Sequence, residues 1–152
     1  HLKFNRRYCR KVNNETLQVH PKMNANIVVL KLFPGITKAT VQAILKQNKT
    51  EAILLETFGS GNAPTSKWFL DEIEQAINRG QFILNVSQCM GGTVEMGRYE
   101  TSKRLKDLGV LSAYDMSFEA ALTKLMFVLG CTKSKEKRIA LLSANLQGEM
   151  TL

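Results

Sequence analysis

Three polar segments that contain glycine hold the residues of this sequence that could take part in chemistry. They are 33–37 (FPGIT), 58–64 (FGSGNAP) and 87–92 (SQCMGG). Each follows an apolar, β-branched run with the length of a buried strand. Because ligands of open α/β sheets bind beyond the carboxyl ends of the strands, we expect any site to be built from these segments.

Asn62 is a candidate binding residue in the second segment. Its carboxamide donates and accepts hydrogen bonds at once, and Gly59 and Gly61 allow the backbone to turn tightly before it. Such a residue fits the wall of a pocket. The alternative is that Asn62 closes the turn or caps the next helix, and the sequence leaves both roles open.

Cys89 is the candidate nucleophile of the third segment. A thiol needs a base to activate it, and the two histidines, His1 and His20, lie in an N-terminal stretch without a clear structural period. We therefore expect Cys89 to be a packed structural thiol. The three cysteines show no CxxC spacing, which indicates reduced thiols rather than a disulfide framework or a zinc site.

The remaining polar candidates form no self-sufficient catalytic group. Ser117 fits a helix N-cap better than a catalytic serine, and Asp115 and Lys124 are expected to be surface or capping groups. Tyr99 follows a glycine-rich stretch, and composition does not decide whether it is exposed. Segment 58–64 lacks the third glycine of a dinucleotide-binding loop, so we expect no metal and no cofactor.

Alternating strands and helices must position these loops. Strands are predicted at 27–32, 52–55, 82–86 and 110–111, and helices at 38–47, between Pro64 and Gly80, and at 101–108, 118–129 and 135–145. This order predicts an α/β fold, a three-layer, Rossmann-like domain with a mostly parallel four-stranded sheet flanked by helices. Residues 1–25 read as a linker or leader, and 26–152 as the domain.

Composition fits one compact domain. The chain has 152 residues, 44% of them hydrophobic, without a long apolar run or a signal-peptide core, which predicts an intracellular protein. Its net charge of +8 raises the question of nucleic acid. A net +5 falls within residues 1–22, so the excess belongs to a leader, and we do not expect nucleic-acid binding.

Five segments together resemble the type I, cytoplasmic, bacterial L-asparaginases over about residues 27–152. They are 32–36 (LFPGI), 59–64 (GSGNAP), 87–94 (SQCMGGTV), 97–99 (GRY) and 115–125 (DMSFEAALTKL). The resemblance implies a cytoplasmic amidohydrolase that converts L-asparagine to L-aspartate and ammonia with a threonine nucleophile. That threonine lies in a larger N-terminal catalytic domain of the family, which nothing here matches. The resemblance therefore implies that this chain holds no catalytic residue.

The resemblance also implies a supporting role for this C-terminal domain. In the family it lends pocket residues to the neighbouring subunit of a homodimer or tetramer, and Asn62 and Tyr99 match those positions. A regulatory asparagine site of some type I enzymes is matched by Asn62, Ser87 and Cys89. Where certain members have an arginine for the effector carboxylate, this sequence has Glu56, and like charges repel. Glu56 therefore disfavours allosteric control.

Two alternatives stay open at this point. The asparaginase-like subunit of a tRNA-dependent amidotransferase would reuse much of the same fold. A non-enzymatic binding module with a basic N-terminal arm is the second, and salt-dependent retention on polyanions would support it. Neither alternative involves a membrane.

Overall fold

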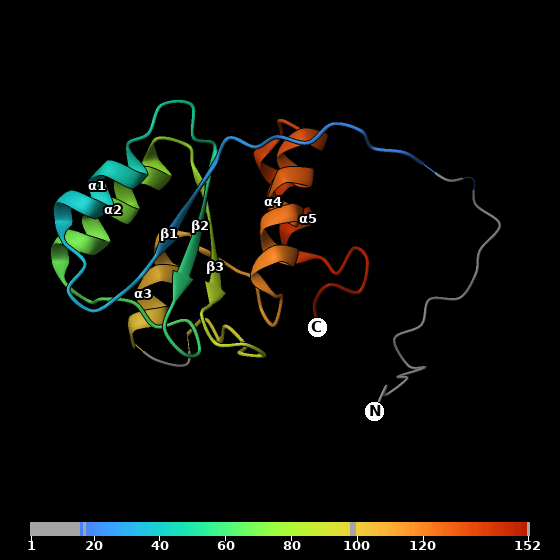
Figure 1. Cartoon of the computed structure of the whole chain (residues 1–152). Helices are drawn as coiled ribbons and strands as arrows, with labels where there is room; N and C mark the ends of the chain where they lie inside the picture. The colour runs from blue at the N-terminus through green and yellow to red at the C-terminus, as the bar shows by residue number, and fades with distance from the viewer. Residues whose placement is uncertain (1–15, 17, 98–99, 152) are drawn as a thin grey trace.

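A computed structural model describes residues 16, 18–97 and 100–151 of the chain. It contains four strands and five helices (Figure 1). The strands are β1 (Ile27–Lys31), β2 (Ala52–Thr57), β3 (Phe82–Ser87) and β4 (Leu111–Ser112). The helices are α1 (Lys38–Leu45), α2 (Lys67–Asn78), α3 (Glu100–Leu108), α4 (Phe118–Cys131) and α5 (Lys135–Ser143).

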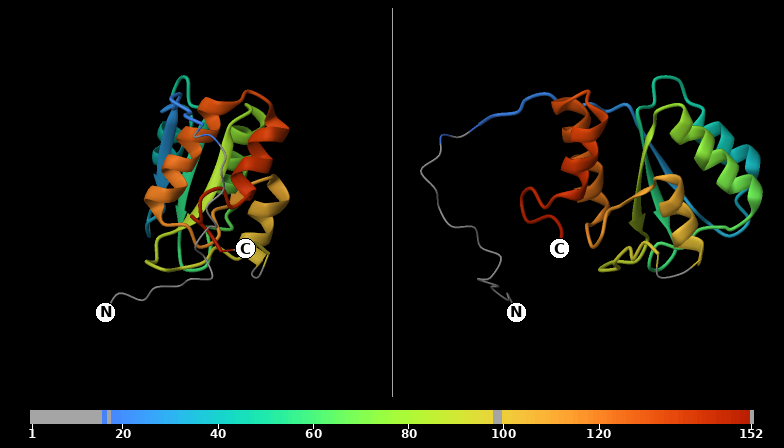
Figure 2. Two further views of the ribbon diagram at one scale, coloured as in Figure 1. Left: turned by 90° about the vertical axis from the view of Figure 1, so that its right-hand side faces the viewer. Right: turned by 180° about the vertical axis from the view of Figure 1, so that it is seen from behind.

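The strands form one sheet in the order β1-β2-β3-β4, and every neighbouring pair is parallel. Helices α1, α2 and α3 cover one face, and α4 and α5 cover the other (Figures 1 and 2). This confirms the predicted three-layer α/β fold. The carboxyl ends of the strands lie together at one edge, so the loops after β1, β2 and β3 meet there.

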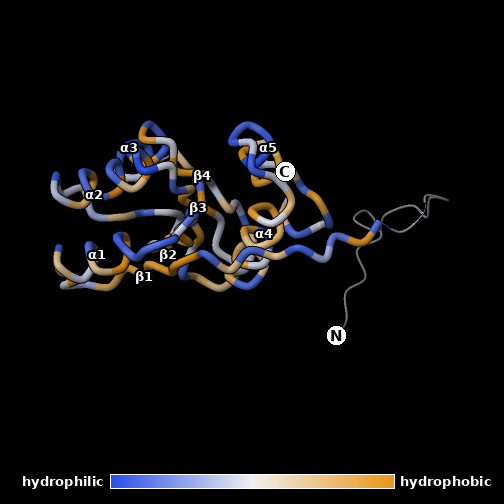
Figure 3. Tube along the Cα trace, turned by 90° about the horizontal axis from the view of Figure 1, so that it is seen from above, coloured by the Kyte–Doolittle hydropathy of each residue, from blue (hydrophilic) through white to orange (hydrophobic). Residues whose placement is uncertain are grey.

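Residue alternation along the strands divides the core into two clusters. Ile53, Leu55 and Ile83 pack with α1, α2 and α3, whereas Leu54 and Leu84 pack with α4 and α5. All six residues of β2 are buried, which is expected of a strand covered on both faces. Figure 3, seen from above, shows the strands between the two helical layers.

Helix starts follow the sequence closely. Thr37 and Ser117 cap α1 and α4, and their hydroxyls accept hydrogen bonds from the amides of Thr40 and Ala120. Gly80 follows α2 with φ +87°, as a residue past a helix end often does. The cap at Ser117 confirms the N-cap predicted there.

Three helix ends differ from the prediction, and one of them is later: α4 continues to Cys131, two residues beyond its predicted end. Helix α1 ends at Leu45 and α5 ends at Ser143, each two residues earlier than predicted. After α5 the chain turns extended at Ala144, whose carbonyl accepts a hydrogen bond from Nζ of Lys124. Helical periodicity in the sequence does not reveal this tertiary contact, so it overestimates the helix.

Lys124 is also a correction to the expected surface lysine. Its side chain is 4% exposed and forms an ion pair of 2.7 Å with Glu149. The amides of Leu146 and Gln147 donate to the same carboxylate. Lys124 is thus buried because the segment after α5 folds back over α4.

Candidate functional site at the carboxyl ends of the strands

The chain closes into a tight loop immediately after β2. The amide of Phe58 donates to the carbonyl of Asn62 at 2.9 Å, and the amide of Asn62 donates back at 2.8 Å. Gly59 and Gly61 lie between them at φ +50° and +103°, in the region that favours glycine. These bonds fix the position from which the Asn62 side chain leaves the loop.

Gly61 is also required because neighbouring side chains leave no room for a methyl group at this position. A methyl group at this residue would lie 2.9 Å from Cγ1 of Val94 and 3.3 Å from Nδ2 of Asn85. The amide of Glu95 donates to the carbonyl of Ser60 at 3.0 Å, so the 93–97 segment runs against the loop. The loop is therefore packed from outside as well as closed on itself.

Asn85 supports the loop from inside the sheet. It is fully buried on β3 and accepts a hydrogen bond of 2.6 Å from Oγ1 of Thr57, at the end of β2. Its amide donates to the carbonyl of Gly61 at 3.3 Å. Because an unpaired buried carboxamide would be costly, this network specifies one loop position.

Ser87 and Gly92 connect the loop after β3 to the loop after β2. The hydroxyl of Ser87 donates to the carbonyl of Gly59 at 2.5 Å and accepts from the amide of Cys89 at 3.0 Å. A methyl group at Gly92 would meet that hydroxyl at 2.5 Å. The structure thus brings Ser87, Cys89 and the loop that ends at Asn62 together.

Gln88 ties the ends of three strands together. Its Nε2 donates to the carbonyl of Leu32 at 2.6 Å and to the carbonyl of Glu56 at 3.0 Å. These carbonyls follow β1 and lie on β2, while Gln88 itself follows β3. One side chain therefore holds the site's edge of the sheet in register.

Glu56 lies on the opposite face of the sheet from Ser87. Side chains of a strand alternate between faces, and Glu56 follows the α4-facing Leu54, whereas Ser87 shares the face of Ile83. The Glu56 side chain is 12% exposed and pairs with Nζ of Lys31 at 3.3 Å. The structure does not bring its carboxylate into the Ser87 and Asn62 network.

Asn62 takes one of the two roles that its sequence left open, the closing of the turn. Its backbone closes the turn, and its half-buried side chain accepts a hydrogen bond of 2.8 Å from Oγ1 of Thr101, near the start of α3. Within the described parts of the chain, no group accepts a hydrogen bond from its Nδ2. The carboxamide is thus held on one side, with a donor on the other. Tyr99, the other predicted support residue, lies outside the described residues.

Cys89 is exposed, so the prediction of a packed thiol is wrong. The residue lies in the loop after β3. Its backbone amide, rather than its thiol, bonds to the hydroxyl of Ser87. His20 lies far from it, against Phe127 of α4, with ring centroids 5.6 Å apart. Among the described residues, Cys89 therefore has no histidine beside it that would activate a nucleophile, and His1 lies outside them.

Chemically, the arrangement can orient a polar ligand but offers no activated nucleophile. Its functional groups are carboxamides, hydroxyls and backbone amides, and their hydrogen bonds make the loops rigid. No cluster of three or more histidine, cysteine, aspartate or glutamate residues suited to a metal occurs in the described ranges. The geometry of the described residues suits the placement of a polar ligand by neutral hydrogen-bonding groups.

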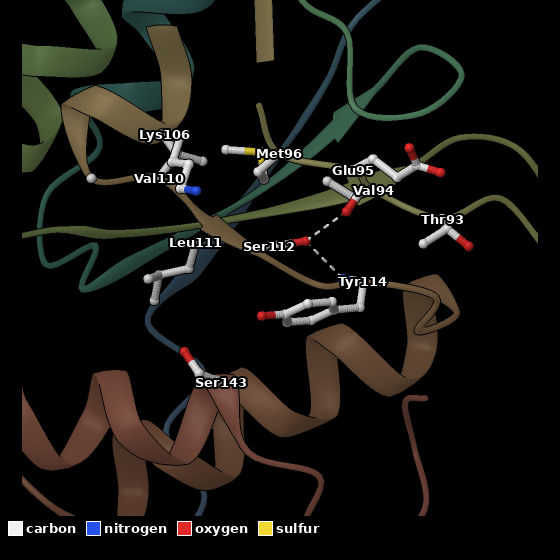
Figure 4. Close-up of a pocket in the computed structure, with 11 residues that line it drawn as sticks. Thr93, Val94, Glu95, Met96, Lys106, Val110, Leu111, Ser112, Tyr114 and Ser143 are labelled. Carbon is white, nitrogen blue, oxygen red and sulfur yellow. Dashed lines mark hydrogen bonds between the residues drawn. The ribbon is translucent and has the colours of Figure 1, made fainter. Parts of the chain in front are cut away.

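A separate cleft of about 570 Å³ lies at the β4 edge of the sheet (Figure 4). Tyr114 projects toward Ser143 across it, with φ +54° fixed by Ser112 and Val94. Of the predicted site residues, the four that the structure describes, Glu56, Asn62, Ser87 and Cys89, do not line this cleft. The cleft has volume, but the polar network of the candidate site lies elsewhere, at the carboxyl ends of the strands. We therefore do not assign the site to this cleft.

Sequence reasoning missed four residues of the site: Thr57, Asn85, Gln88 and Thr101. Asn85 had a detectable feature, because a carboxamide inside the apolar run FILNV is unusual unless it is paired. Thr57 and Gln88 stand at strand ends, where polar residues are ordinary. Thr101 meets Asn62 only through the tertiary fold.

Comparison with known proteins gives this fold and site a family. The family model of the glutaminase/asparaginase C-terminal domain matches residues 26–142. L-asparaginase 1 of Escherichia coli is 41% identical over 135 residues, covering 89% of this chain and 40% of that protein. The crystal structure of L-asparaginase I from Vibrio cholerae superposes with a TM-score of 0.84 at 40% identity, covering 91% of this chain and 42% of that one.

Proteins with other names share the domain. The human 60 kDa lysophospholipase is 41% identical over 152 residues, covering 99% of this chain and 26% of that protein. One subunit of the glutamyl-tRNA(Gln) amidotransferase of Pyrococcus abyssi is 31% identical over 150 residues, covering 99% of this chain and 34% of that subunit.

The chain spans less than half the length of each of these relatives. Among the described residues, no helix combines the length and the apolar character needed to cross a membrane. The five resembling segments, the parallel α/β sheet and the matched family model agree, and the chain belongs to the glutaminase/asparaginase C-terminal domain family.

Proposed function

We propose that this chain is the C-terminal domain of a cytoplasmic L-asparaginase, which hydrolyses L-asparagine to L-aspartate and ammonia. The threonine nucleophile belongs to an N-terminal catalytic domain of the same enzyme. This domain contributes supporting groups to the pocket and a contact surface to a homodimer or tetramer. The role needs no metal or cofactor from this chain.

One observation supports this role most directly. The loop 58–62 holds the Asn62 carboxamide through its own backbone and Thr101, and leaves Nδ2 able to donate within the described residues. A preorganised donor of this kind can orient a substrate carbonyl or carboxylate without reorganisation during the reaction. We also propose Tyr99 as a second support residue, on the resemblance alone.

The amidotransferase subunit is the second candidate. The P. abyssi relative matches nearly the whole chain, but at 31% identity against 41% for the E. coli asparaginase. Free asparagine and a charged tRNA differ in size, and the described loops are short and closed by internal hydrogen bonds. We therefore favour the small amide substrate.

The test is an assay of the protein encoded by the complete gene. Ammonia release is measured with L-asparagine and L-glutamine, and fatty-acid release with lysophosphatidylcholine, because one relative is named a lysophospholipase. We expect asparagine hydrolysis by the complete protein and none by residues 1–152 alone. Efficient hydrolysis by the 152-residue chain, or a complete protein inactive on asparagine, would contradict the proposal.

We also propose that regulation by asparagine is weak or absent. The Glu56 carboxylate opposes a carboxylate effector, although Lys31 offsets part of its charge. Its side chain leaves the sheet on the face away from Ser87. Glu56 therefore supplies neither a positive charge nor a contact to a carboxylate effector held by Ser87, Cys89 and Asn62.

A further inference from the structure

The chain enters the domain along a segment that is bound to the fold rather than free. We propose that residues 20–26 form a fixed strap, pinned at Gly130 and Glu51, which holds whatever precedes it in one orientation relative to the sheet. The strap crosses the end of α4 at the amino ends of the strands, away from the candidate site (Figures 1 and 2).

Gly130 provides the first pin. This residue lies in the last turn of α4, and a methyl group there would overlap the carbonyl oxygen of Lys22 and reach within 3.1 Å of Cα of Met23. The backbone of the strap therefore rests directly on the helix. The amide of Asn24 donates to the carbonyl of Met126 at 3.0 Å, one helical turn earlier.

Glu51 provides the second pin. Its carboxylate accepts a hydrogen bond of 2.8 Å from Nδ2 of Asn24 and ion pairs from Lys133 and Arg138. The carbonyl of Asn26 in turn accepts the amide of Glu51 at 2.8 Å. The strap is thus bonded, through side chain and backbone, to the residue that directly precedes β2.

Arg138 makes this junction part of the core. Its side chain is 7% exposed, and its guanidinium also donates to the carbonyls of Thr132 and Leu129. It lies 5.5 Å from the ring centroid of Phe82, at the start of β3. Strap, sheet, α4 and α5 therefore meet around the buried Arg138 and its partly buried partner Glu51.

The folded unit on this proposal begins near residue 20 rather than at residue 26. Its functional consequence rests on the proposed function: a catalytic domain joined through the strap would keep a set direction with respect to this domain. The strap itself is testable without any enzymatic activity.

The experiment depends on whether Gly130→Ala raises or lowers the stability of the protein. Inside a helix, alanine normally stabilises relative to glycine. If the strap rests on Gly130, the added methyl group must displace it, and the substitution should instead lower the melting temperature. Trypsin cleavage after Lys22 reports the open population of the strap.

We expect Gly130→Ala in the complete protein to raise the rate of cleavage after Lys22 about tenfold or more, since ~1.4 kcal/mol of lost binding gives that factor. Asn24→Asp keeps the acceptor for the Asn26 amide but places a negative charge opposite Glu51. It should also raise the rate of cleavage after Lys22. Asn48→Ala, on the exposed turn after α1, is the control and should leave the rate of cleavage after Lys22 unchanged.

A Gly130→Ala protein that melts higher, with unchanged cleavage after Lys22, would overturn the proposal. Unchanged cleavage in Asn24→Asp would do the same even if Gly130→Ala failed to fold. If the complete wild-type protein showed no asparagine hydrolysis, the proposed function would fail, while the cleavage rates would still decide the strap.

Discussion

The loop network at the carboxyl ends of the sheet and the junction at its amino ends are built from different interactions. At the carboxyl ends, neutral groups such as Asn85, Ser87 and Gln88 bond to backbone carbonyls around glycines. At the amino ends, Glu51 and Arg138 form an ion pair that joins four parts of the chain. Neutral, directional bonds suit the placement of a loop, whereas charges suit the joining of elements.

The stability of the two regions should also depend differently on pH. Burial raises the pKa of Glu51, but the hydrogen bonds from Asn24, Lys133 and Arg138 outweigh it and lower the pKa to about 2. The side chains that hold the loop after β2, namely Thr57, Asn85 and Ser87, are uncharged at every pH of interest. The amino end should therefore lose stability in acid, while the hydrogen bonds of the loop network should persist.

Among the substitutions that test this difference, Gly61→Ala should change the free energy of unfolding most. The φ of +103° and the contact with Val94 both oppose a methyl group, so we expect a loss of about 3 kcal/mol in the free energy of unfolding. Gly109→Ala is the matched control, because its φ is +100° with open space around it, and should lose only about 1 kcal/mol. Denaturant unfolding compares the two, and equal losses would show that packing against the loop is unimportant.

Glu51→Gln should have the next largest effect, and it should depend on pH. A carboxyl whose folded pKa lies below its ordinary value of 4.5 contributes stability that is complete above about pH 5 and lost as the pH falls through 2. We expect a loss of about 2 kcal/mol at pH 7 that shrinks toward zero near pH 2. Urea unfolding of both proteins from pH 7 to pH 2 measures it, and a pH-independent difference would contradict the charge-based junction.

Glu56→Arg should have the smallest effect on the fold. The substitution replaces an ion pair between a side chain that is 12% exposed and one that is 63% exposed with two like charges, so we expect a loss of about 1 kcal/mol in the free energy of unfolding. Calorimetric titration of the complete enzyme with asparagine tests regulation. We expect one class of sites in the wild type, and a second class there would refute the role assigned to Glu56.

Sequence periodicity predicted the fold well because the sheet is simple. Each buried strand follows the last in order, and Thr37, Ser117 and Gly80 mark helix ends through local chemistry. Local chemistry could not reveal the early end of α5, where Lys124 reaches the carbonyl of Ala144 across 20 residues of chain.

The site was predictable only in part, for the same reason. The glycines and Asn62 stand out in the sequence because they are unusual together. Thr101 lies 39 residues from Asn62 along the chain, and nothing local indicates that their side chains meet. Exposure of Cys89 likewise depends on how the loop is held by Ser87, which a count of apolar neighbours does not predict.

The most direct measurement is the kcat/KM for asparagine of the complete enzyme carrying Asn62→Ala, alongside its free energy of unfolding. Removing the carboxamide leaves the backbone bonds of the loop in place, so we expect less than about 1 kcal/mol of lost stability but at least about a tenfold loss of kcat/KM. Thr101→Val, which frees the carboxamide without removing it, should give a smaller loss. An Asn62→Ala enzyme with wild-type kcat/KM would contradict a supporting role for this loop.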